Sequence, residues 1–182
     1  MFPDDIDALA RQVIETAAAK GLMVATAESC TGGLVAGALT AVAGSSAVVE
    51  RGFVTYSNAA KSELLGVPAG LIDRLGAVSG DVAGAMAQGA LTRSAAAVSV
   101  AVTGIAGPGG GSADKPVGLV HFAAAGPTGL IHLEQRFGDI GREAVRLESV
   151  RAALRLLLDR RPRNAPGRPA CRPILRPGRR CR

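Results

Sequence analysis

The residues with the clearest chemical potential form the run Glu28-Ser29-Cys30-Thr31-Gly32-Gly33, which follows a short apolar stretch and precedes a helical pattern. A serine on a glycine-assisted turn from a strand into a helix stands beside free backbone N–H groups, which can stabilise an oxyanion or bind a phosphate. The pattern resembles a nucleophile elbow, although G-x-S-x-G is absent. Helix capping by Ser29 or Thr31 explains the same local sequence equally well.

A serine nucleophile requires a base to accept its proton. Lys61, in the segment Tyr56-Ser57-Asn58-Ala59-Ala60-Lys61, is one candidate, because a lysine desolvated in a cleft can titrate low enough to act as a base. Tyr56 could relay or orient the proton. A solvated lysine and a half-buried packing tyrosine are the ordinary alternatives. His121 and His132 lie in a predicted hairpin, where neither has a sequence neighbour that suggests a relay.

Two further features could bind an anion. A glycine-rich loop, Gly104 to Gly111, follows Thr103 at the end of the most apolar predicted strand. Ligands bind at this end of strands in open α/β sheets, but the loop matches neither the Walker pattern nor G-x-G-x-x-G. Arg142 and Arg146, one turn apart on the last predicted helix, could clamp a phosphate. A surface pair beside Glu143 is an equally good explanation of these arginines.

The elements that must position these residues alternate between helices and strands. Apolar periodicity predicts helices over 3–20, 34–42, 59–65, 68–75, 81–92 and 141–158, and strands over 22–27, 47–56, 96–103, 117–125 and 129–137. Ser79 is expected to cap the helix that starts near residue 81. The order predicts an α/β fold, a single-domain three-layer sandwich with a mixed, mostly parallel sheet.

The charge divides the chain into two parts. Residues 160–182 hold nine of the 21 basic residues and no acidic one, so 12 basic and 15 acidic residues remain and give residues 1–159 a net charge of −3. The Arg/Pro-rich tail over 160–182 lacks apolar periodicity and is predicted to be disordered. A frame-shifted reading of GC-rich codons would produce such a composition. Nucleic acid is therefore expected to bind only non-specifically, through this tail.

The remaining composition excludes several classes. No run approaches the ~20 apolar residues of a membrane span, and the acidic amphipathic N-terminus is unlike a secretory signal. Cys30 stands alone in the body, without metal-ligand spacing, which favours a reducing compartment and no zinc site. We expect a cytoplasmic protein that binds a small molecule and does not bind a membrane. A homo-oligomer is possible.

Four segments closely resemble the C-terminal domain of the CinA family, the nicotinamide-nucleotide amidohydrolases. They are TAESCTGG (26–33), GFVTYSNAAKSELLGV (52–67), GAVSGDVAGAMAQGA (76–90) and VAVTGIAGPGGGSADKPVGLVHFA (100–123), and they occur in the family's order. The resemblance extends over nearly all of residues 4–158, and residues 1–159 are identified as a CinA-like amidohydrolase domain. Larger family members carry an additional N-terminal domain, which is the part associated with metal dependence.

The resemblance implies deamidation of nicotinamide mononucleotide to nicotinic acid mononucleotide and ammonia, with no cofactor or metal. It implies Ser29 as nucleophile and Lys61 as base, with Tyr56 also catalytic. The substrate would be bound by Cys30, Thr31, Gly32, Thr103, Gly104, Gly107 and Arg142, of which Arg142 matches the family's G-D-R segment only approximately.

Two alternatives stay open. Glu28, Lys61 and Cys30 have the residue types of a Glu-Lys-Cys amidase, although strand alternation points neighbouring side chains to opposite sides. A non-catalytic nucleotide-binding or competence-associated accessory module, suggested by the family's historical name, is the other.

Overall fold

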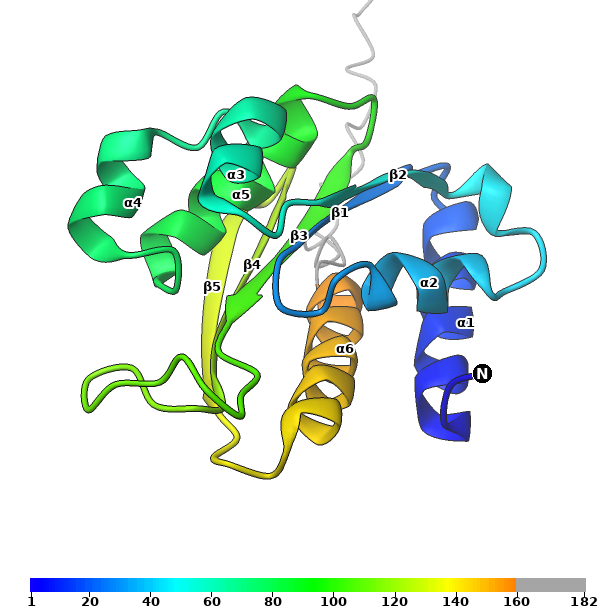
Figure 1. Cartoon of the computed structure of the whole chain (residues 1–182). Coiled ribbons are helices and arrows are strands. Elements are labelled where there is room, and N and C mark those ends of the chain that lie inside the picture. Colours follow the sequence, from blue (N-terminus) through cyan, green and yellow to red (C-terminus); the bar gives the residue numbers. More distant parts are fainter. Residues whose placement is uncertain (160–182) are drawn as a thin grey trace, which may run out of the picture.

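The structure is a computed structural model that describes residues 1–159, so the predicted tail over 160–182 lies outside the described residues. A five-stranded sheet in the order β2-β1-β3-β4-β5 forms its middle layer (Figure 1). The strands are β1 (Val24–Glu28), β2 (Val49–Val54), β3 (Val98–Gly104), β4 (Leu119–Gly126) and β5 (Gly129–Arg136).

The direction of the strands places the candidate residues at one end of the sheet. β1 pairs in parallel with β2 and with β3, whereas β4 is antiparallel to both β3 and β5. Four of the five strands therefore run the same way, and the predicted mixed, mostly parallel sheet is confirmed. Because β4 is reversed, β5 ends at the same edge as β1 and β3, and the last helix begins there.

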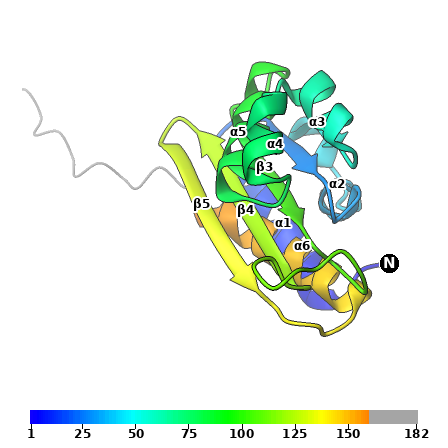
Figure 2. The same cartoon turned by 60° about the vertical axis from the view of Figure 1, so that its left-hand side comes forward.

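Helices cover both faces, as predicted (Figure 2). On one face lie α1 (Asp4–Ala18), α2 (Leu34–Thr40) and α6 (Arg142–Asp159), and on the other lie α3 (Asn58–Leu65), α4 (Ala69–Leu75) and α5 (Gly80–Thr92). The first core is built mainly from Val and Leu around Phe122, and the second from Ala and Val around Met86. This low aromatic content is compatible with a full core because the small side chains let α5 lie close to the sheet.

Element boundaries follow local hydrogen bonding. The predicted strand at 22–27 starts instead at Val24, because Gly21 adopts a positive φ of 60° and the Leu22 N–H donates to the Ala17 carbonyl, which closes the end of α1. The predicted strand at 47–56 begins only at Val49, after a short 3-10 turn, Ser45–Ala47. Ser79 caps α5 as predicted, since its Oγ accepts the Val82 N–H at 3.3 Å. Within residues 1–159, no helix is long and apolar enough to cross a membrane.

The tight contact between α5 and α3 leads to a stability prediction. A Cβ built on Gly89 would lie 2.0 Å from the Leu65 carbonyl oxygen, whereas one built on Gly70 in α4 meets nothing within 4 Å. Gly89→Ala should therefore lower the free energy of unfolding by about 2–3 kcal/mol, because the helices must move apart. Gly70→Ala should instead raise it by roughly 0.5 kcal/mol, through helix propensity. Urea unfolding monitored by circular dichroism measures both, and equal effects would contradict this packing.

Candidate active site

A serine and a lysine meet at the carboxyl end of the sheet. Ser29 directly follows β1, and Lys61 lies one turn into α3 with its Nζ 2.9 Å from the Ser29 Oγ. The lysine is 1% exposed, and its Nζ also contacts the carbonyl oxygens of Thr55 at 2.9 Å and Tyr56 at 3.3 Å. Capping of α3 by Ser57, whose Oγ accepts the Ala60 N–H, directs the helix so that Lys61 folds back over this turn.

The surroundings of Lys61 suit a neutral amine. Burial lowers the pKa of Lys61 below its usual 10.5, because desolvation disfavours the ammonium form. A neutral amine has two N–H donors and one lone pair. If the carbonyls of Thr55 and Tyr56 take the two hydrogens, the lone pair faces the Ser29 hydroxyl and can accept its proton. The same contacts satisfy all three hydrogens of the protonated form, so both protonation states fit one geometry.

Glu28 shapes the turn but does not pair with the lysine. Its fully buried carboxylate accepts the backbone N–H groups of Gly33, Val35 and Ala36 at 2.8–3.0 Å, together with the Thr26 hydroxyl at 3.2 Å. These amides belong to the first turn of α2, which has no side-chain cap from its own N-cap residue. Glu28 therefore supplies the acceptors that this helix end lacks and fixes the path of residues 29–33.

Cys30 is a poorer nucleophile than Ser29 in this structure. Its side chain is 6% exposed, and burial raises the pKa of the thiol to about 12. At neutral pH it is therefore a protonated thiol rather than the reactive thiolate. Because the Glu28 carboxylate is also directed to α2, the geometry opposes the Glu-Lys-Cys alternative.

A pocket of about 260 Å³ opens beside the Ser29–Lys61 pair. The structure brings together in its wall eight of the predicted site residues: Ser29, Cys30, Tyr56, Lys61, Thr103, Gly104, Gly107 and Arg142. Thr31 and Gly32 lie outside this lining. The Gly32 N–H donates to the Ser29 carbonyl at 3.1 Å, and Thr31 is fully buried with its carbonyl bonded to Arg146. Of the three residues Cys30, Thr31 and Gly32, which were predicted to bind the substrate, only Cys30 therefore lines the pocket.

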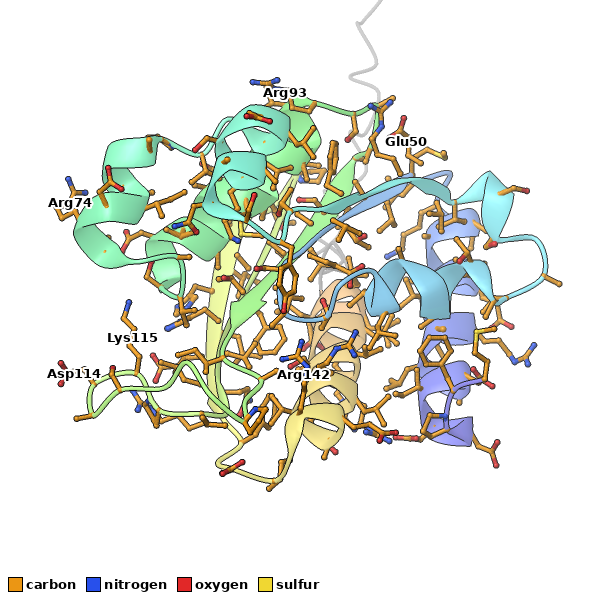
Figure 3. All side chains as sticks on the ribbon, in the orientation of Figure 1. Glu50, Arg74, Arg93, Asp114, Lys115 and Arg142 are labelled. Atoms are coloured by element: carbon orange, nitrogen blue, oxygen red, sulfur yellow. The ribbon has the colours of Figure 1, made fainter. Side chains whose placement is uncertain are left out.

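The far wall is held by contacts across the sequence. The Thr103 hydroxyl donates to the Ala77 carbonyl at 2.8 Å, and Lys115 donates to the carbonyls of Leu75 and Val78. In Figure 3, Lys115 points from its loop toward α4, while Arg142 points from α6 toward the pocket loops. These bonds join the glycine-rich loop to the segment before α5.

Tyr56 and Arg142 form a bridge at the rim of the pocket. Arg142 donates to the Gly107 carbonyl at 2.9 Å and to the Tyr56 hydroxyl at 3.1 Å. The Tyr56 side chain is 61% exposed, and it is the backbone carbonyl of this residue that reaches Lys61. The Tyr56 phenol is thus hydrogen-bonded to Arg142, and Lys61 contacts the backbone carbonyl of Tyr56 and not its phenol. Arg146 contacts the Thr31 carbonyl at 2.8 Å instead of joining Arg142 in this pocket.

Sequence reasoning missed several contacts. The Thr55 carbonyl, Asn58 and the segment Ala77–Val78 all face the site. They lie within the segments 52–67 and 76–90, but the sequence did not predict them as site residues. His121 and His132 have paired ring nitrogens 3.0 Å apart, with Glu134 at 3.9 Å from His121. The two-residue hairpin turn would have predicted this pairing, because it fixes the register of β4 and β5. Among the described residues, no three His, Cys, Asp or Glu side chains are grouped to hold a metal ion.

The sequence is similar to those of known proteins. The family model of the CinA C-terminal domain matches residues 6–160. A CinA-like protein from Synechococcus sp. (strain RCC307) is 54% identical over 86% of this chain, which spans only 38% of that relative. The nicotinamide-nucleotide amidohydrolase PncC from Enterobacter agglomerans is 56% identical, with 77% of this chain and 85% of that protein covered.

Solved structures of this family have a similar fold. The competence/damage inducible protein CihA from Agrobacterium tumefaciens has a TM-score of 0.86 at 60% identity, covering 87% of this chain and 97% of that chain. A CinA superfamily protein from Escherichia coli has a TM-score of 0.81 at 38% identity, covering 87% and 92%.

The buried carboxylate of Glu28 leads to a second prediction. Glu28→Gln keeps the shape of the side chain but turns one acceptor oxygen into an NH2 donor, which then faces backbone N–H groups. The free energy of unfolding should fall by about 2–3 kcal/mol, because buried donors lose their acceptor. Glu63→Gln, at an exposed position on α3, should change it by less than about 0.5 kcal/mol. Urea titration of both variants compares them, and a loss shared by Glu63→Gln would contradict this role.

Proposed function

Because the chain belongs to the CinA C-terminal domain family, we propose that it is an amidohydrolase that converts nicotinamide mononucleotide to nicotinic acid mononucleotide and ammonia. The observation that carries the proposal is the 2.9 Å contact between the Ser29 hydroxyl and a buried lysine amine. The relative from Enterobacter agglomerans, named for this activity, supports the substrate class. Nicotinamide carries a carboxamide, which is the group that a serine nucleophile can attack.

The proposed reaction has two halves. The Ser29 Oγ bonds to the amide carbon while its proton passes to the Lys61 Nζ, and the carbonyl becomes an oxyanion beside the Cys30 N–H. As the oxyanion collapses, the carbon–nitrogen bond breaks and Lys61 returns the proton to the departing ammonia. Water then attacks the acyl-enzyme and gives one proton to Lys61. The bond between the acyl carbon and the Ser29 Oγ breaks, Lys61 returns this proton to the Ser29 oxygen, and the carboxylic acid product loses its remaining proton to solvent.

The charge of the pocket favours a nucleotide. Within the described part of the chain, its lining contains the guanidinium of Arg142 and the buried amine of Lys61, and no carboxylate. We assign the phosphate to Arg142 with the loop residues Thr103, Gly104 and Gly107. Arg142 would exchange its bonds to Tyr56 and Gly107 for the phosphate oxygens, a stronger charge-assisted contact. Tyr56 then acts as a positioning residue for this arginine.

In the proposed cycle Lys61 activates first the Ser29 hydroxyl and then the water, so every proton transfer is assigned to a residue of the chain without a cofactor or a metal ion. The cycle belongs to pyridine nucleotide salvage in the cytoplasm, because a charged nucleotide does not cross the membrane unaided. The competence-associated names of the relatives favour a non-catalytic binding module as the second candidate. A binding module would retain the nucleotide without releasing ammonia, so one assay separates the two.

Substitution of the paired residues tests the mechanism. With EDTA present, Ser29→Ala should lower kcat for ammonia release by roughly three orders of magnitude or more, and Lys61→Met should approach the same loss. Cys30→Ala, the matched neighbour, should cost less than roughly tenfold, because the attacking oxygen remains. The Ser29/Lys61 double variant should be little worse than either single change, since both act in one step.

Three outcomes would contradict the assignment of Ser29 as nucleophile and Lys61 as base. An inactive Cys30→Ala beside an active Ser29→Ala would transfer the nucleophile to the thiol. Near-wild-type rates in all variants would place the chemistry elsewhere. Binding of the mononucleotide without turnover by the unmodified chain would support the binding module.

The lowered pKa of Lys61 gives a pH prediction. Only the neutral amine accepts the Ser29 proton, so kcat/KM should be small at low pH and rise as Lys61 loses its proton. Because burial lowers that pKa, the rise should occur below 10.5, the ordinary pKa of lysine, and level off above it. Lys61→Arg should lose both the activity and the rise of kcat/KM with pH, since a guanidinium stays protonated over the whole pH range. If the rise of kcat/KM with pH persists in Lys61→Arg, another group is the base.

A further inference from the structure

Ser29 is the first residue of a tight turn. The Gly32 N–H donates to the Ser29 carbonyl at 3.1 Å, which closes a β-turn with Cys30 and Thr31 at its central positions. Gly32 has a φ of 62°, a left-handed conformation that a glycine adopts without strain. The directions of the Ser29 hydroxyl and of the Cys30 N–H are set by this turn, so the groups that hold the turn also set the geometry of the reaction.

One peptide group of the turn is held from both sides. The Thr31 carbonyl accepts a hydrogen bond from the Arg146 guanidinium at 2.8 Å, and the N–H of the same peptide group is the Gly32 donor to Ser29. The C=O and N–H of a trans peptide lie in one rigid plane and point in opposite directions. Arg146 therefore orients this plane so that its N–H closes the turn, although the arginine lies 115 residues further along the chain.

Arg146 makes this contact at a cost in stability. Its Nε and the Thr31 Oγ1 are buried, and neither atom has a hydrogen-bond partner among the described residues. None of the ion pairs found within residues 1–159 includes Arg146. A buried donor without an acceptor destabilises a fold, and an apolar side chain at the same position avoids that cost. An arginine here is therefore better explained by function than by stability.

Two arginines of α6 reach different parts of the site. Arg142 and Arg146 are four residues apart and so lie on one face of the helix. Arg142 bonds to the Tyr56 hydroxyl and the Gly107 carbonyl at the rim of the pocket, whereas Arg146 bonds to the turn that carries the nucleophile. Arg142 lines the pocket and Arg146 does not. The two cations therefore have separate tasks.

We propose that Arg146 is a positioning residue, which acts through the Thr31 carbonyl to direct the Ser29 hydroxyl to Lys61 and the Cys30 N–H to the oxyanion. This inference rests on the proposed role of Ser29 as nucleophile. Without the guanidinium the peptide plane loses one of its two anchors, and the turn can rotate. The phosphate site around Arg142 stays intact. Chemistry should therefore slow while binding of the nucleotide is retained.

The separation of kcat from KM is the first test. Arg146→Met keeps an unbranched side chain with a helix propensity close to that of arginine. It should lower kcat for ammonia release by roughly 10- to 100-fold, as a small displacement of a reacting group does, and Arg146→Lys, which retains one donor, should lose less. Arg142→Met should instead raise KM. Arg155→Met, at an exposed position on the same helix, should change neither constant. A raised KM with an unchanged kcat in Arg146→Met would overturn the proposal.

Unfolding in urea separates positioning from a purely structural role. The urea midpoint of Arg146→Met should equal or exceed that of the unmodified chain, because the substitution removes a buried donor without an acceptor. Arg155→Met provides the reference for an exposed arginine on α6. If the midpoint of Arg146→Met falls, and kcat falls only as far as the folded fraction does, the arginine is merely structural and the proposal is refuted.

A fluorophosphonate measures the placement of the nucleophile without the nucleotide. The Ser29 Oγ bonds to phosphorus, fluoride leaves, and the hydroxyl proton passes to Lys61. The rate of this labelling, followed by mass spectrometry, should fall in Arg146→Met by a factor similar to that in kcat, and should be unchanged in Arg155→Met. Equal rates in Arg146→Met and the unmodified chain would overturn the role of Arg146 while ammonia release keeps the proposed function. Slower labelling of Arg146→Met, in a chain that releases no ammonia from the mononucleotide, would refute the proposed substrate and support the role of Arg146.

Discussion

The amine of Lys61 lies in a buried position between two backbone carbonyls and one serine hydroxyl. Everything else in the site is arranged around this contact. Burial alone would penalise the lysine, but the carbonyls of Thr55 and Tyr56 fix its direction and satisfy its hydrogens. The same burial lowers the pKa of the amine, so the feature that costs stability is also the one on which the proposed mechanism depends. β2, the turn after it and the cap of α3 all contribute to this one geometry.

An acid lies next to the serine without neutralising the base. Glu28 and Ser29 are neighbours in sequence, yet the carboxylate is directed to the first turn of α2 and the hydroxyl to Lys61. Had the carboxylate contacted the lysine, it would have held the ammonium form and removed the base. The change of direction at the end of β1 therefore separates two charges that would otherwise cancel. It also gives Glu28 a structural role, in place of the catalytic one that its residue type suggested.

Much of this could be predicted from the sequence. Apolar periodicity located the helices and strands, and the motifs around Ser29 and Lys61 indicated the pair that the structure brings together. The direction of individual polar groups could not be predicted, because it depends on tertiary contacts. The Tyr56 carbonyl rather than its phenol reaches Lys61, and the Gly32 amide is already bonded to Ser29. The contact between His121 and His132 is different, because it follows from the register of β4 and β5, which the two-residue turn sets.

The reversal of β4 has a consequence for synthesis of the chain. It returns β5 to the carboxyl edge of the sheet, so Arg142 reaches the pocket from α6, the final described element. Ser29 and Lys61 emerge from the ribosome long before that arginine does. Because domains of this size fold cooperatively, a nascent chain that ends before α6 lacks the contribution of this helix to one core as well as Arg142 at the rim of the pocket. The Ser29–Lys61 pair and the Arg142 side of the pocket are therefore completed together, after α6 has been synthesised, and a shorter nascent chain does not hold the assembled pocket.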